Sequence, residues 1–174
     1  MGMIEVQIDG LAMDLVSNSP VVVLASKELN KVLPIWIGHG EAWAIAMEMT
    51  GVGSKRPLTH DLFKSTIEAM GGRLEKVEIT ELKEQTFYAR LLITLDGRTV
   101  DVDARPSDSI ALALKAKSPI FANAELLTLN AEDLQVESAD EKPPAPPGGG
   151  TTESLADRLK RIDPEDFGKY SLLE

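Results

Sequence analysis

The chain has 174 residues, of which 43% are hydrophobic and 26% charged, a size that fits one globular domain with or without a tail. It contains no cysteine and only His39 and His60 as imidazoles, which excludes a disulfide scaffold, a cysteine-ligated metal centre, a thiol nucleophile and a three-histidine site. The formal net charge of −10 argues against nucleic-acid binding by bulk electrostatics, because Lys and Arg must neutralise the phosphates.

The N-terminal residues do not resemble a targeting signal. Residues 1–6, MGMIEV, have no basic segment and no unbroken apolar run. No stretch of the chain approaches the roughly 20 apolar residues of a membrane-spanning helix. We therefore expect a cytoplasmic protein with no membrane partner.

Period-two hydrophobic patterns predict strands in both halves of the chain. Residues 3–8 alternate apolar and polar side chains, and residues 12–16 are expected to pair with them as a hairpin across Asp9-Gly10. Pro34 is expected at an edge or near the start of its strand. Further strands are predicted at residues 21–24, 33–37, 74–81, 87–95, 99–104 and 120–121.

Helices are predicted for residues 41–49, 59–70 and 109–117. Thr59 is a candidate cap for the second helix, and Ser107 or Asp108 for the third. Strands and helices come in blocks and not in regular alternation. The predicted fold class is therefore α+β, with a mixed, mostly antiparallel sheet and about three to four helices.

The composition changes near residue 137. Residues 137–152 read ESADEKPPAPPGGGTT and predict a flexible linker between a domain at residues 1–136 and a tail at residues 153–174. Apolar residues at i, i+4 and i+7 in the tail, Leu155, Leu159 and Ile162, predict a short helix that needs a surface to dock on. Residues 1–131 carry a net charge of −4, so most of the acidity lies in the tail.

The first candidate site lies at the start of the predicted helix at residues 59–70. His60 and Asp61 could serve as a general base and a metal ligand, with Lys55 and Arg56 holding a phosphate. Alternatively, Thr59 caps a helix whose positive end simply favours Asp61.

The second candidate site spans a strand end and a helix start. Asp101 and Asp103 lie two residues apart on one face of a strand and could hold Mg²⁺ or Mn²⁺, or could be its solvated face. Arg105 could bind a phosphate or form an ion pair with Asp61 or Asp108.

Glu41 and Glu48 share one face of the first predicted helix, and a solvated face is the simpler interpretation. The domain has no Walker loop, no GxGxxG, no GxSxG and no basic patch with interleaved aromatic residues.

Three motifs occur in order: LPIWIG followed by Glu41-Ala42, RPLTHDL from Arg56, and DARPSDSIALA from Asp103. Together they resemble the bifunctional nuclease domain family of bacteria and plants, over about residues 1–130. The resemblance implies an α+β domain that forms a homodimer or higher oligomer and a nuclease active on DNA and RNA. Its polar motif residues are site candidates: Glu41, Arg56, His60, Asp61, Arg105 and Asp108.

We therefore expect a phosphodiester hydrolase with little sequence preference, assisted by Mg²⁺ or Mn²⁺. The expected catalytic residues are His60, Asp61 and Asp108, the substrate-binding residues Lys55, Arg56 and Arg105, and the metal ligands Asp61, Asp103 and Glu41, with Asp108 as a further candidate ligand. The alternative is a non-catalytic oligomeric binding module in which these motifs form a structural polar network.

Overall fold

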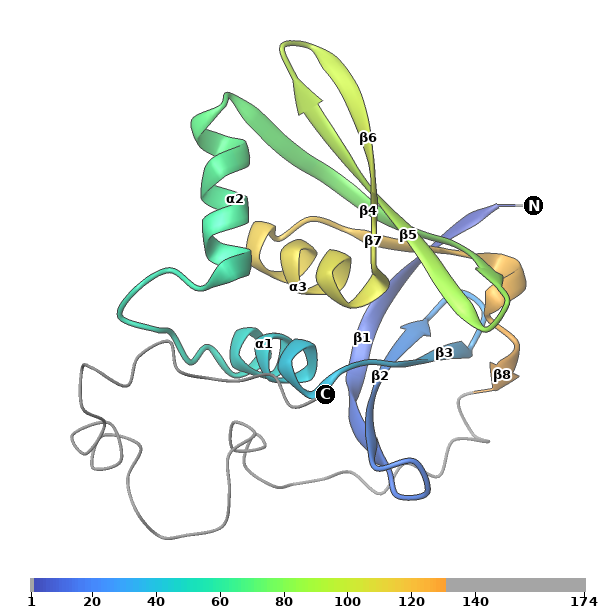
Figure 1. Cartoon of the computed structure of the whole chain (residues 1–174). Helices are drawn as coiled ribbons and strands as arrows, with labels where there is room; N and C mark the ends of the chain where they lie inside the picture. The colour runs from blue at the N-terminus through green and yellow to red at the C-terminus, as the bar shows by residue number, and fades with distance from the viewer. Residues whose placement is uncertain (1, 131–174) are drawn as a thin grey trace, which may run out of the picture.

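The computed structural model describes residues 2–130, which form an eight-stranded sheet and three α-helices (Figure 1). The fold is α+β with a mostly antiparallel sheet, as the sequence predicts. The predicted linker, the predicted tail helix and the domain boundary at residue 136 lie outside the described residues.

The sheet consists of two meanders joined by a short strand. β1–β2–β3 and β4–β5–β6 each pair antiparallel in sequence order, and β7 joins them by pairing antiparallel with β1 and parallel with β4. The strand order is β6-β5-β4-β7-β1-β2-β3-β8. The strands are β1 Met3–Asp14, β2 Ser19–Ser26, β3 Lys31–Trp36, β4 Gly72–Lys83, β5 Thr86–Leu95, β6 Arg98–Ala104, β7 Ile120–Asn123 and β8 Leu129–Asn130.

The predicted hairpin across Asp9-Gly10 is wrong, because β1 runs through these residues as one strand with an irregularity between Ile8 and Gly10. The chain turns after Asp14, whose carboxylate accepts a hydrogen bond from the backbone N–H of Val16 at 3.0 Å. Asn18 completes the turn at a φ of 52°. The Asp-Gly signal therefore marks a bulge within a long strand.

The three helices are α1 His39–Thr50, α2 Thr59–Ala69 and α3 Pro106–Ala116. The predicted caps are wrong: Leu58 precedes α2, and Arg105 precedes α3, which begins three residues earlier than predicted. Pro106 occupies the first position of α3, where its fixed φ and missing N–H suit a helix start. Asp108 is consequently inside the first turn, with its carboxylate free to bind other side chains.

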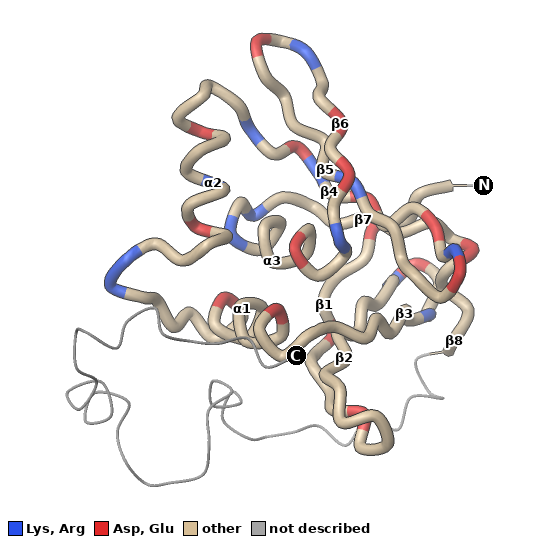
Figure 2. The backbone as a smooth tube through the Cα atoms, viewed as in Figure 1, with Lys and Arg blue, Asp and Glu red and all other residues tan. Residues whose placement is uncertain are grey.

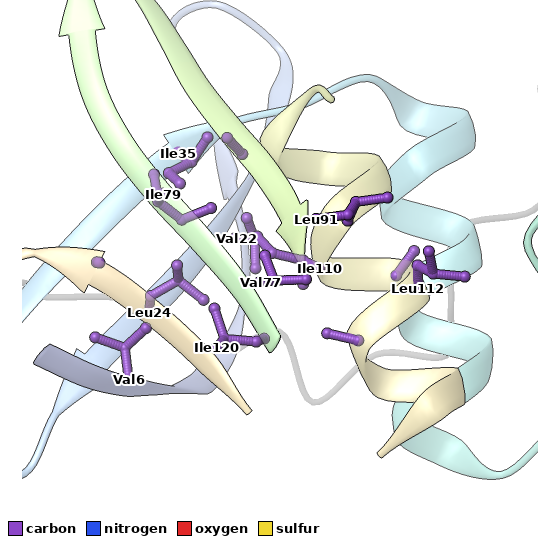
Figure 3. Close-up of a cluster of buried hydrophobic side chains, with 14 of the residues drawn as sticks. Val6, Val22, Leu24, Ile35, Val77, Ile79, Leu91, Ile110, Leu112 and Ile120 are labelled. Atoms are coloured by element: carbon purple, nitrogen blue, oxygen red, sulfur yellow. The ribbon is translucent and has the colours of Figure 1, made fainter. Parts of the chain in front are cut away.

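The core lies between the sheet and α3, as Figure 3 shows for side chains from β1, β2, β4 and α3. Ile110 on α3 and Val22 and Val77 on the strands are completely buried. α1 and α2 flank α3 and contact each other less than they contact it. This packing fixes the position of α3, and polar side chains of α1 and α2 then bind residues of α3.

Two short elements escaped the sequence prediction, the 3₁₀ helix Ala124–Leu126 and the two-residue strand β8. Pro34 lies on β3, whose outer neighbour β8 pairs only with Lys31 and Val32, so the expected edge position is confirmed. Within residues 2–130, no helix has both the length and the hydropathy to cross a bilayer.

Candidate functional site

A histidine–carboxylate pair connects the N-terminal turns of α2 and α3. His60 Nε2 lies 3.0 Å from Asp108 Oδ1, although the two residues are 48 positions apart in the chain. The His60 side chain is largely buried, and that of Asp108 is about one-third exposed. The fold thus brings together two of the three predicted catalytic residues.

Arg105 extends this pair to α1. Its Nε donates a hydrogen bond to Asp108 Oδ2 at 2.7 Å, and its terminal nitrogen lies 2.9 Å from Glu41 Oε1. Of the partners considered from sequence, Arg105 therefore pairs with Asp108 and not with Asp61. The result is a continuous line of charged side chains from Glu41 through Arg105 and Asp108 to His60.

The third predicted catalytic residue, Asp61, belongs to a second network. Its Oδ1 lies 2.6 Å from Lys115 Nζ, and its Oδ2 accepts the Leu58 backbone N–H at 2.8 Å. Lys115 also donates to Glu48 Oε2 at 3.0 Å. The Lys115 side chain is only 11% exposed, so one largely buried ammonium joins α1, α2 and α3.

The predicted solvated face of α1 is wrong, because Glu41 and Glu48 both turn toward α3. Glu41 pairs with Arg105 at the start of α3, and Glu48 pairs with Lys115 near its end. Lys115 itself was missed from the sequence. Lys115 could have been found as the one basic residue of α3, near the end of the apolar run from Ile110 to Leu114, where a buried charge requires a partner.

The charges of both networks shift the pKa values of their members. Hydrogen bonding by Lys115, supported by the Leu58 N–H, lowers the pKa of Asp61. Burial opposes ionisation of Asp108, yet hydrogen bonds from Arg105 and His60 outweigh it and lower the pKa of this carboxyl. Asp108 is therefore an ionised acceptor near neutral pH, and His60 Nε2 carries the proton in their hydrogen bond.

His60 lies between two hollows of the surface. The first, between α1 and the start of α2, has a volume of about 390 Å³ and includes Lys55, Arg56 and Lys115 in its lining. The second, of about 570 Å³, lies between α2 and the β5–β6 hairpin and is lined mainly by apolar side chains. His60 and its neighbouring backbone thus separate a polar hollow from an apolar groove.

Lys55 and Arg56 lie on the loop between α1 and α2, where Figure 2 shows a basic segment. Both residues are exposed, and neither has a carboxylate partner within residues 2–130. They line the same hollow as His60 and Asp61. These two cations are available to bind an anion, whereas Arg105 is already neutralised by two acids.

The three predicted metal ligands do not meet. Asp61 binds Lys115 and Glu41 binds Arg105, while Asp103 pairs across the sheet with Arg90 in the β5–β6 register. Within the described residues, no three His, Asp or Glu side chains gather closely enough to hold a metal ion. This part of the chain therefore offers no preformed set of three side-chain ligands for a divalent cation.

The fold and the site together define a class: an α+β domain with a histidine–carboxylate pair at the contact of two helix starts. Residues 22–146 match the family model of the bifunctional nuclease domain, and the chain belongs to this family. The match covers the three motifs that carry the resemblance in the sequence.

An uncharacterised protein of Mycobacterium tuberculosis is 39% identical over 163 residues, covering 94% of this chain and 97% of that protein. Bifunctional nuclease 1 of Arabidopsis thaliana is 28% identical over 80% of this chain, and bifunctional nuclease 2 of the same plant is 28% identical over 63% of it. These matches span 44% and 34% of the two plant proteins. The mycobacterial match covers 163 of the 174 residues and therefore extends into the segment beyond residue 150.

Proposed function

We propose that this domain hydrolyses phosphodiester bonds in DNA and RNA with little sequence preference. The observation that carries the proposal is the placement of His60 on the wall of a hollow that also contains the unpaired cations Lys55 and Arg56. Family membership and the name of the plant relatives, bifunctional nuclease, support the same reaction.

In the proposed reaction, His60 acts as the general base. Ionised Asp108 accepts the Nε2–H hydrogen bond, which leaves Nδ1 unprotonated in neutral histidine. Within the described residues Nδ1 has no hydrogen-bonding partner, so it can accept a proton from the attacking water as that oxygen bonds to phosphorus. The P–O bond to the leaving group then breaks, the leaving oxygen takes a proton from solvent water, and His60 returns its proton to solvent.

Lys55 and Arg56 hold the phosphate in this proposal. Both can approach a phosphate without first breaking an ion pair in the described part of the chain. Arg105 fixes the carboxylate of Asp108 and so acts as a positioning residue. Asp61 similarly fixes the first turn of α2 through its bonds to Leu58 and Lys115.

In this proposal Mg²⁺ or Mn²⁺ assists the reaction, although residues 2–130 contain no cluster of three side-chain ligands for it. An assay with each metal ion and with EDTA tests this assistance. The cysteine-free composition favours the cytoplasm as the compartment of the reaction.

The test is hydrolysis of labelled single- and double-stranded DNA and RNA by wild type, His60→Ala and His39→Ala, with Mg²⁺, Mn²⁺ or EDTA. The matched control uses the other histidine, which is exposed at the start of α1. We expect a rate loss of about 100-fold or more in His60→Ala and none in His39→Ala. Equal cleavage by wild type and His60→Ala would contradict the proposal and indicate a contaminating nuclease.

A second candidate function is a non-catalytic binding module, which the mutual pairing of the site residues favours. Both networks join all three helices, as a purely structural network would. This function predicts a sharp loss of thermal stability in His60→Ala, whereas the nuclease predicts lost activity with stability nearly kept.

We also propose that the domain forms a homodimer or higher oligomer. Apolar side chains gather at the β1–β2 turn, where Leu15 is 82% and Val16 98% exposed beside the exposed Trp36. A second copy would cover this surface. Light scattering should give a multiple of 18.9 kDa for wild type and a smaller multiple for Val16→Lys.

A further inference from the structure

Ile67 packs against the core, but the rest of the apolar face of α2 is uncovered in the described part of the chain. None of its eleven residues is buried, and Leu62 is 61% and Phe63 44% exposed. The apolar residues of this helix nevertheless follow the period expected for a buried face. A helix with this pattern gains stability when another surface covers it.

The uncovered face forms one wall of the 570 Å³ groove between α2 and the β5–β6 hairpin. Leu91, Val102 and Leu112 contribute apolar side chains from β5, β6 and α3. Figure 1 shows α2 opposite the hairpin, with α3 below both. Most of the surface that lines the groove is therefore apolar, and the groove is open to solvent.

Polar residues mark one end of the groove. Asp108 and Asp103 lie there together with His60 and Arg105. Arg105 is paired with two carboxylates, Asp108 and Glu41, and so adds little free positive charge. An occupant with an apolar stripe and adjacent basic residues would match this surface in both hydrophobicity and charge.

Residues 154–162 of this chain, SLADRLKRI, have that pattern. Helical spacing places Leu155, Leu159 and Ile162 in one stripe. The segment also contains three of the five basic residues that follow residue 131, namely Arg158, Lys160 and Arg161. The region matched by the mycobacterial protein includes this segment.

The chain between β8 and this segment is long enough to reach the groove. Residues 131–153 span up to roughly 75 Å when extended, more than the diameter of a domain of this size. A covalent tether of this length also gives an effective concentration on the order of millimolar, which favours docking within one molecule.

We propose that residues 154–162 dock as a helix in the groove between α2 and the β5–β6 hairpin of the same chain. The apolar stripe covers Leu62 and Phe63, and the basic residues face the acidic end.

The absence of cysteine makes disulfide crosslinking a clean test in the full-length chain. Ala156→Cys lies beside the apolar stripe and is combined either with Thr66→Cys in the groove or with Ser17→Cys at the β1–β2 turn. Thr66 and Ser17 are both exposed, and the Ser17 control also samples the other apolar surface. The readout is intramolecular disulfide formation under mild oxidation.

We expect the Ala156→Cys/Thr66→Cys pair to crosslink about tenfold faster than the Ala156→Cys/Ser17→Cys pair. Adding Leu159→Asp should remove this difference, because it places a charge in the apolar stripe without altering the described domain. Equal rates, a preference for Ser17, or a preference that survives Leu159→Asp would overturn the proposal.

A mixture of two singly substituted chains, Ala156→Cys and Thr66→Cys, separates docking within one chain from docking onto a second copy. We expect no crosslinked dimer, and a dimer forming as fast as the intramolecular product would overturn the same-chain proposal. None of these measurements uses nucleic-acid cleavage. Failure of the nuclease proposal would therefore leave the docking result intact, and the reverse also holds.

Discussion

Helices α2 and α3 have the same length of eleven residues and meet the rest of the molecule in different ways. Seven residues of α3 are buried, whereas none of α2 is. The two site residues of α2, His60 and Asp61, bind partners that lie on α3, Asp108 and Lys115. Packing therefore fixes α3, and polar contacts then place the α2 side chains against it.

The largest difference between the helices should appear on truncation of an apolar side chain. Ile110 of α3 is completely buried, and Ile110→Ala should reduce the free energy of unfolding by about 3 kcal/mol because it leaves a cavity. Leu62→Ala on α2 should cost about 1 kcal/mol or less, since Leu62 is 61% exposed within residues 2–130 and is covered only by the proposed docked segment. Urea denaturation measures both, and equal losses would contradict the comparison.

Removing the ammonium that joins the helices should have the next largest effect. Lys115→Met should cost about 2 kcal/mol, because it leaves Asp61 and Glu48 unpaired at a largely buried position. Lys64→Met is the matched control, since Lys64 pairs with Glu68 on the exposed surface of α2 and should contribute about 0.5 kcal/mol or less. Thermal denaturation of the two variants gives the difference, and a larger loss in Lys64→Met would refute the assignment.

Acidification should weaken the attachment of α2 by a smaller amount. The pKa of Asp61 in the folded protein is lowered below its ordinary value of 3.8, first by the hydrogen bond from Lys115. Its contribution is therefore present above pH 3.8 and is lost as the pH falls through the lowered value.

We expect Asp61 to contribute roughly 0.5 kcal/mol to the stability lost as the pH falls below 3.8. The contribution is small because about a third of the Asp61 side chain is exposed and water screens the interaction. Asp61→Asn should be less stable than wild type at neutral pH and should lose less stability on acidification. Urea midpoints measured from pH 6 to pH 2.5 test this, and parallel curves would show that Asp61 does not contribute.

The smallest expected stability effect belongs to Arg105. Its side chain is 67% exposed, so Arg105→Gln should change the free energy of unfolding by no more than about 0.5 kcal/mol despite two lost ion pairs. The nuclease proposal expects cleavage to fall more than stability, because Asp108 loses the group that fixes it. A sharp drop in melting temperature would instead favour the structural-module alternative.

Much of the fold was predictable because its strands and helices have clear periodicities. The exception in β1 arose because Asp9-Gly10 is a strong turn signal in isolation, whereas cross-strand pairing from Gln7 to Asp14 holds the strand through it. β8 was not predictable, since two residues carry no period.

The site was less predictable than the fold. The three sequence motifs contain His60, Asp108, Arg105 and Glu41. In the structure these side chains contact one another in sequence, from Glu41 to His60. Local spacing suggested the Arg105–Asp108 pair, but the pairs between different helices depend on the packing of α1, α2 and α3. The contacts of Glu41 with Arg105 and of Glu48 with Lys115 likewise depend on how α1 packs against α3.

The position of strand β7 affects how the domain folds during synthesis. Its four residues join the two meanders by pairing with β1 and β4, and they come late in the described chain. During translation, β1 keeps one open edge until β7 has left the ribosome, and an open edge is a site of aggregation. The closing step joins residues near opposite ends of the domain, a long-range contact that slows folding and lengthens dependence on chaperones.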